Sequence, residues 1–293
     1  MSATLSPDDA LTLRAGALEA VLWPSLGGRI AALSSEGVHW LKPIPQDQPA
    51  EHPLLSGGCY PMAPYCGRIE KGRFSFGGVE HRLPPHRIAG PHSLHGLAWD
   101  TPFQAERVSD GEARMWLDHP GGDAWPWAFR LEQTVRLEPD ALMLRMRLTS
   151  ADEAPQPAGL GFHPFFPRDG ARLTFAAGGW WRLGPTMVPV GCEDLPSGYD
   201  FAAGREVSEG FDDVFSGFDG VARLEWGDRA IQMSASSNLT TAVLYSPQGR
   251  GFFCFEPISH APNAHNRDGA PDLEVLHAGE SLEIEMRLEM IGR

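Results

Sequence analysis

The sequence predicts an all-β fold, a large antiparallel β-sandwich, from three observations. Apolar residues alternate with polar ones in several segments, and this period of two buries one face of a strand. The 33 glycines and 26 prolines among the 293 residues supply turn residues throughout the chain. No capped amphipathic stretch of helical period is longer than about three turns.

The strand pattern is clearest from residue 131 onward. Apolar residues of one parity occupy 131–137 and 142–148, on either side of the turn sequence Glu138-Pro139-Asp140, which predicts a hairpin. The pattern returns in five further segments: 222–226, 230–235, 241–245, 251–255 and 282–290. Such spacing favours a sandwich or barrel over alternating βαβ units. Because no linker, charge block or fixed-period repeat divides the chain, we expect residues 1–293 to form a single domain.

The charge balance excludes two classes of partner. Lys and Arg total 24 and Asp and Glu total 38, so the net charge is −14, which repels both the phosphates of nucleic acids and anionic lipids. We therefore expect neither nucleic acid nor membrane as a partner. The N-terminus has no basic region followed by an apolar one, and the four cysteines form no CxxC pair. These features predict a soluble, cytoplasmic protein.

Several common catalytic signatures are absent from the sequence. There is no GxxxxGK[ST] phosphate loop and no Gly-x-Ser-x-Gly nucleophile elbow. His92 and His95 are three residues apart, which in extended backbone places their side chains on opposite faces. Since no nearby carboxylate or thiol completes a ligand set, we expect no metal site.

Four short motifs carry polar residues within apolar, turn-rich surroundings: Tyr65–Ile69, Leu94–Gly96, Gly161–Pro167 and Cys254–Pro257. Spacing alone favours structural roles for their arginine and histidines, because most polar residues in such surroundings serve the fold. Glu256 is harder to assign to structure, since it follows the run 252–255 and precedes a proline expected to end the strand. A carboxylate there is either paired or functional, and its pKa depends on burial and on neighbouring charges.

Six motifs, in order, resemble the aldose 1-epimerase (galactose mutarotase) family and cover nearly the whole chain. They are Gly-Gly-Arg-Ile at 27–30, Gly-Arg-Ile-Glu-Lys-Gly-Arg-Phe at 67–74, Ser-Leu-His-Gly at 93–96, His-Pro-Phe-Phe at 163–166, Asp-Asp-Val-Phe at 212–215 and Phe-Glu-Pro at 255–257. The resemblance implies a galactose mutarotase-like supersandwich with an open sugar-binding cleft. It also implies interconversion of the α and β anomers of a free aldose without cofactor or metal, by a monomer or a homodimer.

The resemblance also assigns roles to individual residues. Glu256 matches the general base that takes the proton of the anomeric hydroxyl, and His163 matches the general acid that protonates the ring oxygen. The matches to sugar-binding residues are Arg68, His95 and Asp212, with Asp213 as the alternative if the alignment slips by one. The family pattern is not complete, because Gly67 stands where many members have asparagine and Phe165 where tyrosine is common. These departures bear on specificity more than on catalysis.

The chemistry of a hemiacetal is consistent with these residue types. Ring opening removes one proton from the anomeric hydroxyl and delivers another to the ring oxygen, so we expect the base and the acid to face each other across one sugar. The C–H face of a sugar prefers an aromatic surface. Sandwich cores also use tryptophan, and we expect a core position more often than a sugar contact for each of the candidates: Trp99, Trp125, Trp127, Trp180 and Trp181.

Two other functions remain open on the sequence. A hexose-6-phosphate 1-epimerase would need a cationic pocket, and four arginines near the motifs could supply it: Arg73, Arg82, Arg87 and Arg168. The net charge of −14 argues against this alternative. A non-catalytic carbohydrate-binding or sensor protein could share the fold, since a fold does not fix a function.

Overall fold

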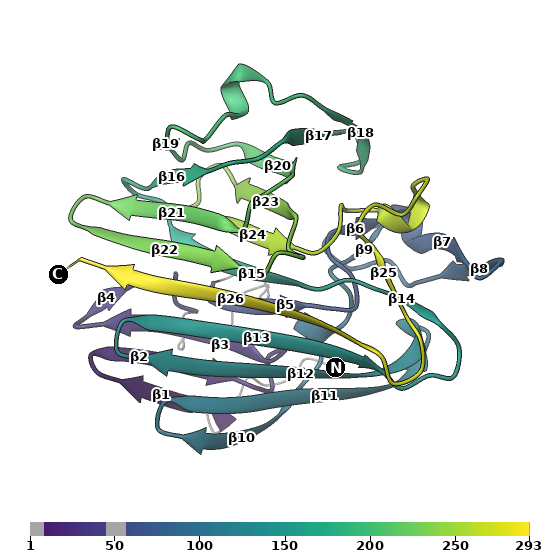
Figure 1. Ribbon diagram of the computed structural model, residues 1–293, viewed down its shortest axis with the longest axis horizontal. Helices are drawn as coiled ribbons and strands as arrows, with labels where there is room; N and C mark the ends of the chain where they lie inside the picture. Colours follow the sequence, from purple (N-terminus) through teal and green to yellow (C-terminus); the bar gives the residue numbers. More distant parts are fainter. Residues whose placement is uncertain (1–8, 45–56, 293) are drawn as a thin grey trace.

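The computed structural model describes residues 9–44 and 57–292, which form strands, turns and short 3₁₀ segments without an α-helix (Figure 1). No helix in this described part is long and apolar enough to cross a membrane. The first large sheet follows the order β1 (Leu11–Ala15), β2 (Leu18–Trp23), β3 (Arg29–Ser35), β5 (Cys59–Met62), β15 (Gly161–Pro167), β24 (Phe252–Ile258), β23 (Thr241–Ser246), β20 (Phe211–Ser216), β17 (Gly179–Leu183) and β18 (Pro189–Glu193), with β4 (Val38–His39) paired to β3.

The second large sheet packs against the first. Its strands follow the order β10 (Gln104–Ser109), β11 (Glu112–Gly122), β12 (Trp125–Glu138), β13 (Ala141–Ser150), β26 (Ser281–Ile291), β22 (Arg229–Ala235), β21 (Val221–Trp226), β16 (Arg172–Phe175) and β19 (Arg205–Glu206). Every strand pair within the two sheets is antiparallel, which confirms the predicted all-β class.

The predicted hairpin and the predicted C-terminal strand are both present. In β12 and β13, Glu138 pairs with Ala141 across the turn at Pro139 and Asp140, as the sequence pattern indicates. In β26 the apolar residues at 282, 284, 286 and 288 are buried and alternate with more exposed charged residues. Period-two alternation is readable here because one face of the second sheet is buried and the other contacts water.

One apolar core fills the space between the sheets. Leu131 and Ile284 from the second sheet and Leu244 and Phe253 from the first are fully buried in it. Each such side chain stabilises the fold by roughly 1.5–3 kcal/mol relative to an exposed position. This core holds the central strands of the first sheet in place and thereby positions the site on their outer face.

The outer face of the first sheet carries a second apolar cluster, which includes Tyr60, Phe165 and Cys254. Strands β15 and β24 are therefore buried on both faces, and every residue of β24 is buried. Successive residues of β24 alternate between the two faces: Phe253 packs into the central core, while Cys254 belongs to the outer cluster.

The register of β15 and β24 places two candidate residues opposite each other. Gly161 pairs with Ile258 and Phe165 with Cys254, and the same register sets His163 opposite Glu256. The expectation that Pro257 ends the strand is wrong, because β24 continues to Ile258. Pro257 and Pro164 both lack an amide hydrogen, so the prolines fall where the β15–β24 ladder is interrupted.

Small two-stranded sheets lie at one end of the sandwich, on the right in Figure 1. They are β6 (Arg68–Ile69) with β9 (Ser93–Leu94), β7 (Arg73–Phe76) with β8 (Val79–Arg82), and β14 (Gln156–Ala158) with β25 (Glu274–Leu276). The short 3₁₀ segments are η3 (Glu70–Gly72), η4 (Ala98–Asp100), η5 (Ser197–Tyr199) and η6 (Ala264–Asn266). The strands β6 and β9 bring Arg68 and the residues after Leu94 to the outer face of the first sheet.

Candidate active site

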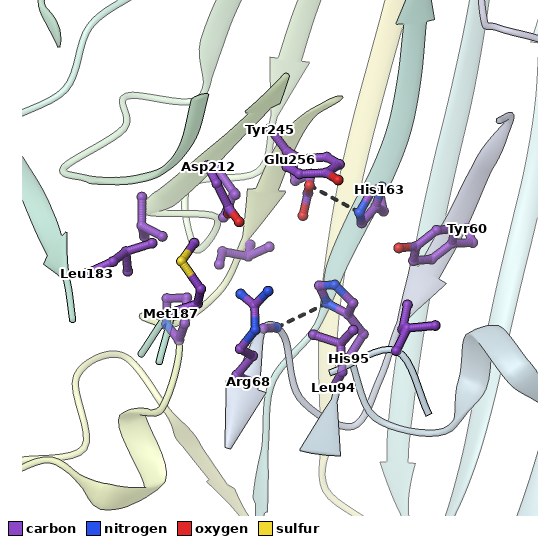
Figure 2. A pocket seen from close by; sticks show the side chains of 16 residues that line it. Tyr60, Arg68, Leu94, His95, His163, Leu183, Met187, Asp212, Tyr245 and Glu256 are labelled. Carbon is purple, nitrogen blue, oxygen red and sulfur yellow. Dashed lines mark hydrogen bonds and ion pairs between the residues drawn. The ribbon is translucent and has the colours of Figure 1, made fainter. Parts of the chain in front are cut away.

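A cavity of about 180 Å³ opens on the outer face of the first sheet, between its central strands and the β6–β9 segment (Figure 2). This volume is below the roughly 300–1,000 Å³ of pockets for drug-sized ligands and suits a smaller molecule. All five residues that the sequence predicted for the site line it: Arg68, His95, His163, Asp212 and Glu256. The fold thus brings together side chains from five separate segments.

Glu256 and His163 contact each other in this cavity. The Oε1 atom of Glu256 lies 3.1 Å from Nε2 of His163, and the two residues are only 3% and 4% exposed. The expectation that they flank a sugar from opposite sides is therefore wrong, because no ligand fits between them. Their contact follows from the register, since directly opposite residues of antiparallel strands are nearest neighbours.

Burial disfavours charge on both members of this pair. Burial raises the pKa of the Glu256 carboxyl well above its usual value, the charge of Asp212 raises it further, and Arg68 opposes both effects. Burial also lowers the pKa of the His163 imidazole well below its usual value, with His95 and Arg29 acting in the same direction. The pair therefore favours a neutral state in which one proton is held between the carboxyl oxygen and Nε2.

His95 is fixed in one tautomer by the backbone. Its Nδ1 accepts a hydrogen bond from the Gly67 amide at 3.1 Å, so Nε2 carries the ring proton. Burial, with help from the Arg68 charge, lowers the pKa of His95 to about 3 and keeps the ring neutral. Figure 2 shows Nε2 on the side of the ring that faces His163. His95 thus offers the cavity a hydrogen-bond donor without a charge.

The potential ligand atoms of His95, His163 and Glu256 lie within 4.8 Å of one another. Spacing in the sequence gave no sign of this cluster, but its chemistry does not suit a metal ion. A metal needs a free lone pair on each imidazole, and the one on His95 Nδ1 already accepts from Gly67. Its other nitrogen carries the proton, so His95 is unable to ligate without breaking that bond.

Asp212 and Arg68 form the polar middle of the cavity, where Figure 2 shows the guanidinium between the carboxylate and His95. Burial raises the pKa of Asp212, Arg68 lowers it, and Asp213 raises it. Asp213, the alternative named for this role, does not line the cavity; its Oδ1 accepts a hydrogen bond from Nε1 of Trp180 at 2.9 Å. Alternation along β20 turns the two neighbouring carboxylates to opposite faces.

The aromatic residues of the cavity are tyrosines. None of the five tryptophans considered for a sugar-facing surface lines it, whereas Tyr60 and Tyr245 do. The Tyr60 ring stacks on His163 with centroids 4.2 Å apart, and the guanidinium of the fully buried Arg29 lies 4.5 Å from the Tyr60 centroid. Four of the five tryptophans instead fill interior space, as the complete burial of Trp99 illustrates, and Trp180 is partly buried.

The two departures from the family pattern have structural explanations. Gly67 has φ of 70°, and a Cβ added there would lie 2.7 Å from Cβ of Pro262, so a side chain at this position would be both strained and crowded. Phe165 is fully buried and stacks on His163 with centroids 4.8 Å apart. Its ring supports the catalytic candidate from within the outer cluster.

Solved structures with this fold have been determined from several bacteria. A candidate aldose 1-epimerase of Escherichia coli K12 superposes with a TM-score of 0.88 and 28% identity, covering 97% of this chain and 99% of that one. A galactose mutarotase-like protein of Clostridium acetobutylicum superposes with a TM-score of 0.86 and 18% identity, covering 97% and 95% of the two chains. The second likeness shows a shared fold.

Sequence comparison gives the same relationship. The uncharacterized protein YphB of Escherichia coli is 30% identical over 244 residues, which are 79% of this chain and 83% of that protein. The galactose mutarotase of Mus musculus is 27% identical over 135 residues, which are 42% of this chain and 38% of that enzyme. The model of the aldose 1-epimerase family matches residues 9–289. The chain therefore belongs to the aldose 1-epimerase family.

Proposed function

We propose that the protein is an aldose 1-epimerase that interconverts the α and β anomers of a free aldose by opening and reclosing the sugar ring. The observation that carries the proposal is the contact between Glu256 and His163 within the cavity, with Oε1 and Nε2 separated by 3.1 Å. A carboxyl group and an imidazole that share one proton can take a proton from a ligand and return one to it.

The two reacting oxygens of a cyclic hemiacetal are bonded to the same carbon, so one adjacent acid–base pair can serve both. In ring opening, the shared proton first moves onto Nε2 of His163. The Glu256 carboxylate then takes the proton of the anomeric hydroxyl while the His163 imidazolium protonates the ring oxygen, and the anomeric carbon becomes a carbonyl. Burial makes this carboxylate a stronger base and this imidazolium a stronger acid, because both charges are lost in the step.

Reclosure completes the exchange of anomers. Rotation about the bond to the carbonyl carbon presents its other face to the hydroxyl that closes the ring. His163 then takes the proton of that hydroxyl and Glu256 returns its proton to the carbonyl oxygen, which restores both groups. No proton is gained or lost over the cycle. General acid–base steps of this kind contribute about 10²–10⁴-fold each to the rate.

The remaining polar residues suit the hydroxyl groups of a sugar. Asp212 offers two acceptor oxygens, and Arg68 offers a planar set of donors. His95 offers one neutral donor, Nε2–H, beside the reacting pair. A neutral donor at this position can bond the ring oxygen without adding a second proton to it.

The lining of the cavity favours a free sugar over a sugar phosphate. Arg68 is its one permanent cation among the described residues, and it faces two carboxyl groups. The four arginines considered as a phosphate site, at 73, 82, 87 and 168, do not line the cavity. A phosphate dianion would meet Asp212 and Glu256 without a compensating cluster of donors. The acid–base pair likewise argues against a protein that only binds sugar, since binding needs no shared proton.

Polarimetry of freshly dissolved α-D-glucose and α-D-galactose tests the proposal. The protein should accelerate the approach to optical equilibrium, and Glu256→Gln should abolish most of that acceleration while sugar binding persists. Glucose 6-phosphate in the same assay separates the two epimerase classes. If only the phosphorylated sugar responds, the free-aldose assignment is wrong, and if Glu256→Gln remains as fast as the original protein, the catalytic pair is wrongly identified.

A further inference from the structure

The segment that carries Arg68 has little backbone pairing of its own. β6 contains two residues, pairs only with the two residues of β9, and is followed directly by the 3₁₀ segment η3. Among the described residues, the Arg68 guanidinium has neither a hydrogen-bond nor an ion-pair partner. The position of that guanidinium in the cavity therefore depends on how the backbone from 66 to 71 is held.

Side chains from elsewhere hold this backbone by accepting its amide hydrogens. Nε2 of His260 accepts from the Cys66 amide at 3.0 Å, and Nδ1 of His92 accepts from the Lys71 amide at 3.0 Å. Further acceptors for the same segment are Nδ1 of His95, for Gly67, and Oδ1 of Asn263, for Glu70. The three imidazoles and one amide thus bond the residues on both sides of Arg68.

The His260 ring is held in the orientation that this bond requires. It is completely buried, and its Nδ1 donates to the carbonyl of Ala261 at 2.8 Å, which leaves a lone pair on Nε2 for the Cys66 amide. A Cβ added to Gly159 would lie 2.0 Å from Cδ2 of His260, so the ring fills all the space beside that glycine. The ring therefore has a single tautomer and a single place.

His92 is similarly enclosed, with 4% of its surface exposed. Neither His92 nor His260 lines the cavity, so neither touches a ligand there. Whatever effect they have on the site must pass through the backbone that they bond. His95 differs, because it bonds the same segment and also faces the cavity.

We propose that His92 and His260 are positioning residues that set the place of Arg68 in the sugar-binding cavity. This inference rests on the proposed role of Arg68 in binding the sugar. If either acceptor is removed, a buried amide beside Arg68 loses its partner, and the segment shifts to find another. The guanidinium then reaches the sugar less often, while Glu256 and His163, held by the sheet, keep their geometry.

The test compares variants that keep an acceptor with variants that remove it. Asn at 92 places an oxygen near the position of Nδ1, and Gln at 260 places one near Nε2. We expect His92→Leu and His260→Leu to raise KM for the sugar about ten-fold with kcat changed less than about two-fold, since a tenfold change matches the usual cost of one unpartnered buried amide. His92→Asn and His260→Gln should recover KM to within about three-fold of the original.

His119→Asn is the matched control, because Nε2 of His119 bonds the Trp125 carbonyl at 2.8 Å, away from the Arg68 segment. It should leave KM unchanged, and thermal melts of all variants identify any that fail to fold. Equal KM values for the Leu and the acceptor-keeping variants would overturn the proposal, as would a loss confined to kcat. Sugar affinity is also measured by calorimetry. If the original protein binds sugar but does not catalyse, only the proposed function is refuted. The affinities of the Leu and acceptor-keeping variants then test the positioning role in place of KM.

Discussion

Two walls of the cavity are built in different ways. On one wall Glu256 and His163 project from neighbouring central strands, whose register alone makes them contact. On the other wall, Arg68 and His95 lie in or next to strands of two residues. These segments are held mainly by side chains that accept hydrogen bonds from backbone amides. The proposed chemistry thus depends on the sheet, whereas the proposed sugar binding depends on a network of side-chain acceptors.

The largest expected effect is on the wall built from the sheet. His163→Asn should lower kcat by about 10²–10⁴-fold, because the shortened side chain no longer reaches the ring oxygen or Glu256. Adding Glu256→Gln should lower kcat little further, since the two groups act as one unit. Polarimetric rates at saturating sugar measure both effects. Losses that multiply fully in the double variant would mean that the two residues act independently.

A smaller effect is expected on the opposite wall. Arg68→Met should raise KM about 10- to 100-fold, which corresponds to the loss of hydrogen bonds from a charged group to a ligand, with kcat nearly preserved. Arg68→Lys should lie between the two, because an ammonium group keeps the charge without the planar donor set. Initial rates over a range of sugar concentration separate KM from kcat. A fall in kcat with KM unchanged would break the contrast between the two walls.

The acceptor network also predicts a dependence of stability on pH. Burial lowers the pKa of His260 from 6.5 to about 4, so between these values the unfolded chain binds a proton that the folded chain does not. Stability is therefore complete above about pH 6.5 and falls as the pH decreases towards about 4. From about pH 7.5 to about pH 5 this one group should cost about 2 kcal/mol, at about 1.4 kcal/mol for each pH unit in that window.

His260→Gln isolates that contribution, because the other titrating groups remain in both proteins. Urea unfolding at the two pH values should show the variant losing about 2 kcal/mol less than the original protein. The absolute stability of the variant does not enter this difference. Parallel losses in the two proteins would show that His260 titrates normally and is not held neutral.

The smallest expected effect comes from a carboxylate beside the site. Asp213→Asn should leave KM and kcat within about two-fold, because this buried side chain lies outside the cavity and an asparagine Oδ1 can still accept from Nε1 of Trp180. Asp212→Asn is the comparison, and it should raise KM by clearly more than its neighbour does, since Asp212 lines the cavity. Similar KM values for the two variants would show that the faces of β20 are wrongly assigned.

The sequence predicts the parts of this molecule in which one face of a strand contacts water. The β12–β13 hairpin and β26 follow the period of two, and both were found as expected. Strands β15 and β24 are buried on both faces, so no alternation tells which side chains share a face or which residues pair. The motifs therefore identified His163 and Glu256 as candidate site residues, but only the strand register in the structure reveals that they contact each other.

The residues of the site and its surroundings that the sequence did not predict escaped for a different reason. His92 and His260 act on backbone amides, and a bond to an amide leaves no pattern in the sequence, because any residue except proline supplies that donor. Tyr60 was not predicted because it lies in a short, buried strand that contains no other strongly polar side chain. The tryptophans were candidates because the C–H face of a sugar prefers an aromatic surface, but four of the five pack in the interior instead.

The cross-strand placement of His163 and Glu256 has a consequence for how such a protein can diversify. A slip of the register by a single residue would turn one of the pair into the central core, so intermediate arrangements do not exist. The surrounding segments are not tied to this register, so a change in them can alter the binding wall while the pair stays intact. A scaffold of this kind can change the ligand preference of its cavity by exchanging loops, while the pair proposed for proton transfer keeps its geometry.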